Sequence, residues 1–76
     1  MGRALYYIVS EDGRWNVRHS GADYPYPTRS TAISAAIDAA RTSGSRGHEA
    51  EVLIEGTDGD WSPAWVYGRD PYPQPD

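Results

Sequence analysis

The chain has 76 residues and no cysteine, and its seven arginines, without any lysine, face eleven carboxylates for a net charge of −4. This composition predicts one small domain and excludes disulfides and thiolate metal sites; it also argues against nucleic acid as a partner, because phosphate binding depends on clustered positive charge. No apolar run is long enough for a signal peptide or a bilayer span, so we expect a cytoplasmic protein without membrane contact.

The first expected element is a β-hairpin over residues 4–19. Residues 4–10 (ALYYIVS) are rich in aromatic and β-branched side chains, and Asp12-Gly13 is a two-residue turn typical of hairpins because both positions favour positive φ. The turn places Ile8 opposite Val17 and Ser10 opposite Trp15. With alternating side chains, the expected core face holds Tyr6, Ile8, Trp15, Val17 and His19, and the other face holds Tyr7, Val9, Asn16 and Arg18.

The only segment with helical periodicity covers residues 28–44 (TRSTAISAAIDAARTSG). Thr28 follows Pro27 and is expected to cap the first turn, with Ser30 as the competing cap. Gly44 is expected to end the helix in the left-handed conformation. A single apolar stripe faces the core at i, i+3, i+4 and i+7, formed by Ile33, Ala36, Ile37 and Ala40.

A second hairpin is expected over residues 50–67, around the turn Asp58-Gly59. Tryptophan follows this turn at the second position, as Trp15 follows the first turn. Pro63 has no backbone N–H, which predicts an edge strand or a bulge. The expected apolar pairs are Gly56 with Trp61, Ile54 with Pro63, Val52 with Trp65, and Ala50 with Tyr67, while the opposite face holds Glu51, Leu53, Glu55, Ser62, Ala64 and Val66.

These elements predict an α+β fold in which two β-hairpins flank one α-helix (β-β-α-β-β), with the helix packed on one face of an antiparallel sheet. Residues 20–27 leave room for a further short extended strand through Tyr24 to Tyr26. Residues 1–68 are expected to form a single α+β domain. Residues 69–76 (RDPYPQPD) are expected to be an extended Pro-rich C-terminal tail, which either folds back onto Trp65 or hangs free.

Four short motifs follow one another along the chain. They are W-x-V at 15–17, T-x-x-x-A-I-x-x-A at 28–36, V-L-I-x-G at 52–56 and Y-G-x-D-P-x-P at 67–73. In this order they resemble a family of small bacterial proteins catalogued as a domain of unknown function, number two thousand one hundred and eighty-eight. The resemblance implies a bacterial or phage origin and a compact β-β-α-β-β unit, and it brings no known activity.

A second, fainter likeness is to the N-terminal domain of bacterial HicB-type antitoxins. The P-x-x-x-G-C-type segment and the DNA-binding tail usual in those proteins are absent from this sequence. The likeness therefore rests on the order of a few residues along the chain. These residues are Tyr6, Tyr7, Val9, Trp15, Thr28 and Ala32.

No group of residues typical of catalysis or metal binding stands out. The two histidines, His19 and His48, have no second ligand at helical spacing, and no serine lies in a G-x-S-x-G turn. Residues 44–47 (GSRG) follow a helix, where the dipole disfavours a phosphate. We therefore expect no enzymatic activity, no cofactor, no metal and no small-molecule substrate.

Aromatic residues are the most informative excess, with three tryptophans and six tyrosines but no phenylalanine. Tryptophan and tyrosine dominate interaction hot spots, and about half of these rings exceed what the core needs. Carboxylates also gather on the second hairpin, either as a solvated face or as a patch for a basic partner. The candidate interaction residues are Tyr7, Arg18, Tyr24, Tyr26, Glu51, Glu55 and Tyr72.

The sequence thus predicts a small non-enzymatic protein-interaction module that binds another protein, or itself as a homodimer through an edge strand. The alternative is an acidic regulator of the antitoxin or phage-inhibitor type, which occupies a basic groove on a target protein. An enzyme would need a deep pocket, which a single sheet covered by one helix is not expected to form.

Overall fold

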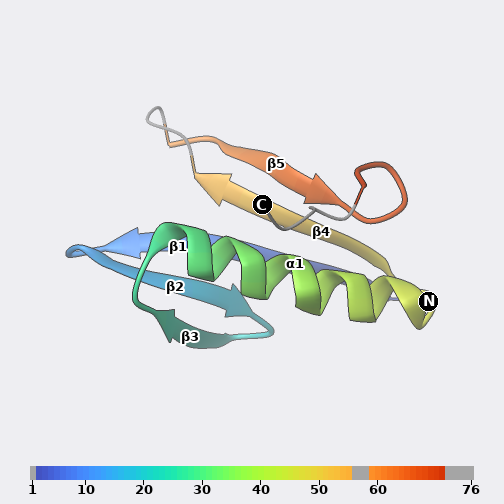
Figure 1. Ribbon diagram of the computed structural model, residues 1–76, viewed down its shortest axis with the longest axis horizontal. Helices are drawn as coiled ribbons and strands as arrows, with labels where there is room; N and C mark the ends of the chain where they lie inside the picture. Colours follow the sequence, from blue (N-terminus) through green and yellow to red (C-terminus); the bar gives the residue numbers. More distant parts are fainter. Residues whose placement is uncertain (1, 56–58, 72–76) are drawn as a thin grey trace.

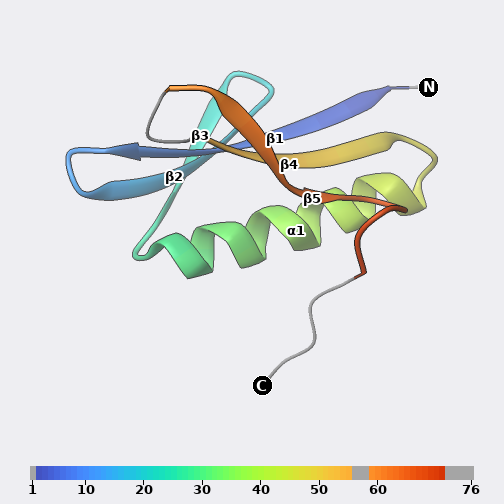
Figure 2. The same ribbon diagram turned by 90° about the horizontal axis from the view of Figure 1, so that it is seen from above.

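A five-stranded sheet with one helix across one face forms the molecule (Figures 1 and 2). The computed structural model describes residues 2–55 and 59–71. The predicted α+β class and the single helix are confirmed. In chain order the elements are β1 (Arg3–Glu11), β2 (Arg14–His19), β3 (Ala22–Tyr26), α1 (Arg29–Ser45), β4 (Glu49–Glu55) and β5 (Trp61–Val66).

Three strands precede the helix, so the order is β-β-β-α-β-β and the predicted β-β-α-β-β order was wrong by one strand. The added strand β3 includes the stretch from Tyr24 to Tyr26 that the sequence left open as extended. It forms because Ser20 and Gly21 both take positive φ, at 52° and 80°, and make a second two-residue turn directly after β2.

The sheet is mixed, and the prediction of an antiparallel sheet was also wrong. Its strand order is β3-β2-β1-β4-β5, and β1 pairs with β4 in parallel, with Tyr7 beside Leu53. The helix explains this arrangement. It runs back along the sheet after β3, so β4 begins at the same end as β1 and adds to the free side of β1 in the same direction (Figure 1).

The first hairpin has the predicted register. Ile8 pairs with Val17 and Ser10 with Trp15 across the Asp12-Gly13 turn, whose two residues have φ of 52° and 74°. Ile8 and Val17 are buried, and Trp15 packs partly buried against the core. The core face of this hairpin was therefore correctly predicted from alternation alone.

The helix begins where expected and ends later. Thr28 caps it, and Thr31 completes a capping box in which each side chain accepts the other's backbone N–H. Gly44 is a helical residue, so its predicted role as the left-handed terminator was wrong; that conformation falls to Gly47, with φ of 94°. Within the described residues, α1 is neither long nor apolar enough to span a bilayer.

Gly44 has a packing role instead. The ring of Tyr67 lies against its backbone so closely that a Cβ atom at this position would overlap the ring. The helix therefore approaches the end of the second hairpin through a residue without a side chain. The expected apolar stripe packs on the sheet beside it, with Ala32, Ala36, Ile37 and Ala40 buried and Ile33 partly buried.

The second hairpin keeps the predicted pairing of Val52 with Trp65. From Leu53 onward, however, the register of β5 against β4 is shifted by one residue. A bulge between Val52 and Leu53 makes Ala64 an extra residue, so Leu53 pairs with Pro63. The predicted pair of Ile54 with Pro63 was wrong, and the bulge predicted from the missing N–H of Pro63 is confirmed. The predicted pair of Gly56 with Trp61 was also wrong, because Trp61 pairs with Glu55. Residues 56–60 therefore connect the two strands in place of the predicted two-residue turn, whose first residue, Asp58, lies outside the described residues.

The bulge exchanges faces in the outer half of β5. Because one residue is added, Trp61 and Pro63 turn to the face opposite the helix, although the regular register placed them on the core face. Trp65, on the other side of the bulge, remains in the core at 5% exposure.

The residues after β5 turn back onto that strand. The Asp70 carboxylate accepts the Val66 N–H at 2.9 Å, and the Val66 carbonyl accepts the N–H groups of Arg69 and Asp70. The Pro71 carbonyl accepts the indole N–H of Trp65 at 3.0 Å. The first residues of the expected tail are thus bonded to β5, in the fold-back arrangement onto Trp65 that the sequence left open.

Candidate protein-interaction face

The sheet has one face away from α1, which we call the open face. Strand registers place one row of residues across all five strands on this face. The described helix lies on the other side (Figure 2). From one edge to the other, the row is Asp23, Arg18, Tyr7, Leu53 and Pro63.

The centre of the open face is apolar. Leu5 and Val9 flank Tyr7 along β1, and all three are half-buried although no described element covers them. Trp61 packs edge-on against Tyr7, with ring centroids 5.0 Å apart and planes at 73°, and is 42% exposed. An aromatic pair of this geometry on an open sheet face has the composition of an interaction hot spot.

Ion pairs border this apolar centre. Arg18 binds Asp23 with two hydrogen bonds, at 2.8 and 3.2 Å, and both side chains are about half exposed. The hydrogen bond from Arg18 lowers the pKa of the Asp23 carboxyl below its ordinary value, and the same bond raises the pKa of Arg18. Between β1 and β4, Nη2 of Arg3 lies 3.6 Å from Oε1 of Glu51.

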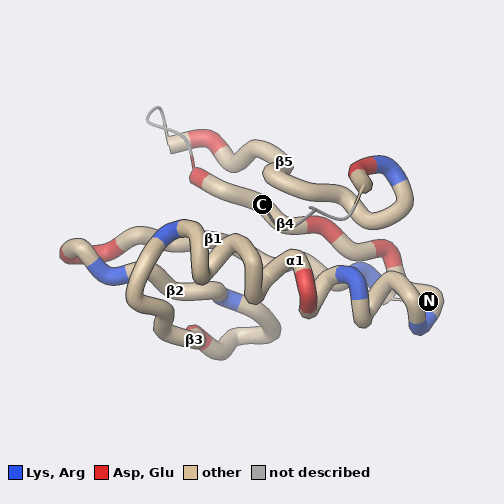
Figure 3. Tube along the Cα trace, in the orientation of Figure 1, with Lys and Arg blue, Asp and Glu red and all other residues tan. Residues whose placement is uncertain are grey.

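The charges on the open face are sorted by strand. By alternation, β2 carries Arg14 and Arg18 there, while β4 carries Glu49, Glu51 and Glu55. Figure 3 shows the basic positions on β2 and the acidic positions on β4, with β1 between them. Between these two strands, the open face of β1 is apolar at its centre and carries Arg3 and Glu11 at its two ends.

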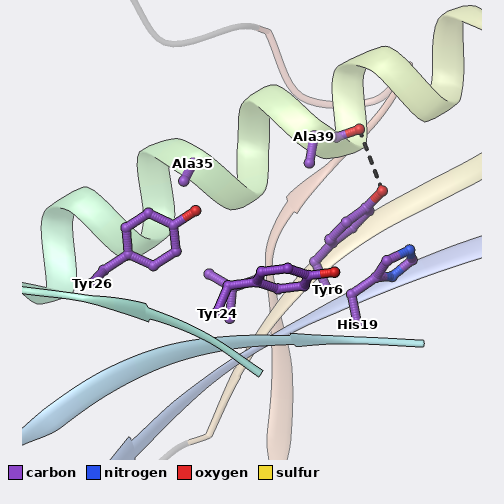
Figure 4. A pocket seen from close by; sticks show the side chains of 7 residues that line it. Tyr6, His19, Tyr24, Tyr26, Ala35 and Ala39 are labelled. Atoms are coloured by element: carbon purple, nitrogen blue, oxygen red, sulfur yellow. Dashed lines mark hydrogen bonds between the residues drawn. The ribbon is translucent and has the colours of Figure 1, made fainter. Parts of the chain in front are cut away.

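A groove with a volume of about 280 Å³ lies between α1 and β3, on the helix side of the sheet (Figure 4). The small side chains Ala35 and Ala39 on α1 leave this space, and aromatic rings from the sheet border it. Tyr6 is one of the lining residues, and its hydroxyl forms a hydrogen bond with Ser43 Oγ at 2.8 Å. The lining residues are Tyr6, Val17, His19, Tyr24, Tyr26, Ala35 and Ala39, none of which is an acid, a lysine or an arginine.

Both histidines are held by backbone groups. His19 stacks on Tyr6 with centroids 4.1 Å apart, and its Nδ1 lies 3.0 Å from the Leu5 carbonyl, so Nδ1 carries the donated proton. His48 Nδ1 accepts the N–H of Gly2 at 3.1 Å. Among the described residues, no three His, Asp or Glu side chains gather in a group able to hold a metal ion.

The candidate residues from the sequence fall into two groups. Tyr7, Arg18, Glu51 and Glu55 lie on the open face by strand alternation. Tyr24, 50% exposed, and half-buried Tyr26 lie on the helix side and line the groove beside α1. Tyr72 lies outside the described residues.

Sequence reasoning missed Leu53, Trp61 and Pro63 as members of this face. Leu53 was placed on the correct side without being counted as a candidate. Trp61 and Pro63 reach it only through the bulge. Pro63 was the available signal, because a residue without an N–H disturbs the ladder and a bulge reverses every side chain beyond it.

Family comparison agrees with the resemblance seen in the sequence. The chain belongs to a bacterial family described as "Uncharacterized protein conserved in bacteria (DUF2188)", whose model matches residues 6–67. The matched range contains the helix and all of the sheet except the start of β1. Searches among curated proteins and among solved structures returned no match.

Proposed function

We propose that this protein is a small non-enzymatic interaction module that binds a protein partner through the open face. The observation that carries the proposal is the Tyr7–Trp61 pair, which lies on the helix-free face with Leu53 and leaves a tryptophan 42% exposed. Burying such aromatic surface against a partner is favourable at roughly 25 cal/mol per Å² of apolar area.

Contact through the face is favoured over addition of a strand at an edge. The outer strands contain Pro25 and Pro63, which supply no backbone N–H for a further ladder. On β5 the N–H of Val66 is also taken by Asp70. We therefore assign the partner to the open face and not to β3 or β5 edges.

The acidic-regulator function is the second candidate, supported by the glutamates of β4. Glu55 is exposed and has no ion pair among the described residues. Two arginines share the same face on β2, so a uniformly basic groove would meet repulsion as well as attraction. This arrangement favours a partner surface that carries both signs of charge.

A site-specific photocrosslink tests the proposal. Replacing Trp61 by benzoylphenylalanine in bacterial cells keeps a large aromatic side chain on the open face and makes it reactive toward a bound protein. We expect a covalent protein adduct that mass spectrometry identifies. The matched control carries the same group at Ser34, an exposed position on α1, and should give no adduct.

A further variant ties the adduct to this face. Adding Leu53→Glu to the crosslinking chain places a charge beside Tyr7 and should abolish the adduct, while circular dichroism shows that the fold remains. Equal crosslinking from positions 61 and 34, or no adduct at position 61, would refute the proposal.

A further inference from the structure

We infer that the partner of the open face is a second copy of this chain, packed face to face about a two-fold axis that runs along β1. This inference rests on the proposed function and names its occupant. In such a dimer the two helices lie on the outside, and the two sheets stack about 10 Å apart. The interface is isologous, so each contact occurs twice.

The shape of the molecule fits this arrangement. Its extents are 35 × 31 × 22 Å. The shortest of them matches one layer of helix on one layer of sheet. The two longer ones give a broad face that holds the roughly 800 Å² per partner typical of a stable interface. A second sheet on the open face would bury the side chains of Leu5, Tyr7, Val9 and Leu53.

The order of strands places complementary charges together. β1 is the third of five strands, so a two-fold axis along it lays the partner's β4 over β2 of the first copy. Arg18 then lies level with the partner's Leu53, between the partner's Glu51 and the partner's Glu55, and the same contacts repeat on the other side of the axis. The basic and acidic strands on either side of β1 are therefore self-complementary.

The same charges exclude the other simple two-fold arrangement. An axis across the strands would lay β2 over β2 and β4 over β4, which sets arginines against arginines and glutamates against glutamates. Like charges that face one another across an interface disfavour association. The axis along β1 pairs opposite signs between β2 and β4 and keeps Leu5, Tyr7 and Val9 in the centre, while Arg3 and Glu11 meet their own copies only at the ends of β1.

Two charge-reversal variants test this dimer by sedimentation of the purified full chain over a range of concentrations. The native chain should sediment as a dimer. Arg18→Glu alone and Glu55→Arg alone should each weaken association at least about tenfold, because both copies then present like charges. Mixing the two variants should restore a heterodimer, since each reversed residue then meets its opposite in both contacts.

Arg29→Glu is the matched control, because it makes the same charge reversal at an exposed position on α1, away from the open face. This variant should remain dimeric, and circular dichroism should show all variants folded. A native chain that is monomeric at every concentration would overturn the inference, as would a dimer unaffected by both reversals or a mixture that stays monomeric. An adduct of position 61 with a different protein, found with a monomeric chain, would refute the dimer and leave the proposed function standing.

Discussion

Two hairpins of this protein carry the same sequence motif, Asp-Gly followed at the second position by tryptophan, and the two tryptophans lie on opposite faces of the sheet. Trp15 packs partly buried against the core on the helix side, whereas Trp61 lies 42% exposed on the open face beside Tyr7. A similar local sequence thus accompanies a core residue in one hairpin and a candidate contact residue in the other.

The two hairpins differ in strand register: two residues connect Glu11 to Arg14 in the first, whereas five connect Glu55 to Trp61 in the second. The first hairpin pairs regularly from Glu11–Arg14 to Tyr7–Arg18, but the second is interrupted by Pro63 and the extra residue Ala64. One inserted residue reverses every side chain beyond it. The shifted register of the second ladder therefore places a tryptophan on the open face.

Truncating the two tryptophans is the strongest test of this comparison. Trp15→Ala leaves a gap against the core and should lower the free energy of unfolding by about 3 kcal/mol. Trp61→Ala removes one edge-on aromatic contact from an exposed side chain and should cost about 1 kcal/mol. Urea unfolding of dilute protein measures both; similar costs for the two variants would contradict the assigned faces.

Gly44 tests how the helix constrains the second hairpin. Gly44→Ala forces a methyl group into the ring of Tyr67, and overpacking of this kind costs about 2 kcal/mol, against a gain in helix propensity of about 1 kcal/mol. We expect a net loss of stability in thermal unfolding. Once Tyr67 is replaced by alanine, adding Gly44→Ala should no longer lower the melting temperature. A Gly44→Ala chain that is more stable than the native one would disprove the close contact.

Asp70 tests whether the second hairpin depends on its C-terminal turn. Asp70→Ala removes the acceptor of the Val66 N–H and should lower the free energy of unfolding by about 1 kcal/mol. Asp70→Asn keeps an acceptor oxygen and should recover part of that loss. Hydrogen exchange at the Val66 amide gives a local readout, and unchanged protection in Asp70→Ala would rule out this bond.

The smallest effect concerns the ion pair beside the first hairpin. Asp23 has a lowered pKa because Arg18 hydrogen-bonds its carboxylate, so the pair favours the fold above the ordinary pKa of aspartate and loses that effect as pH falls through the lowered value. An NMR titration should place Asp23 below the usual value of about 3.9, and Arg18→Gln should return it there. Because both groups are exposed, the change in stability should be barely measurable.

Local chemistry made much of the fold predictable. The Asp12-Gly13 turn set the first register, Thr28 marked the helix start, and the spacing of Ile33 to Ala40 identified the buried stripe. Each of these signals acts between residues close in the chain. Alternation from the turns likewise placed Tyr7, Arg18, Glu51 and Glu55 on one face.

The remaining features depend on contacts between distant segments. The sequence by itself determined an α+β domain with two aromatic hairpins, a capped helix and a proline that disturbs the last strand. Only the tertiary structure decided that β4 adds to β1 in parallel, that Gly44 lies beneath Tyr67 and that Trp61 joins Tyr7. The physical reason is that the return path of the helix sets the position of β4, and the bulge sets the face of each residue beyond it.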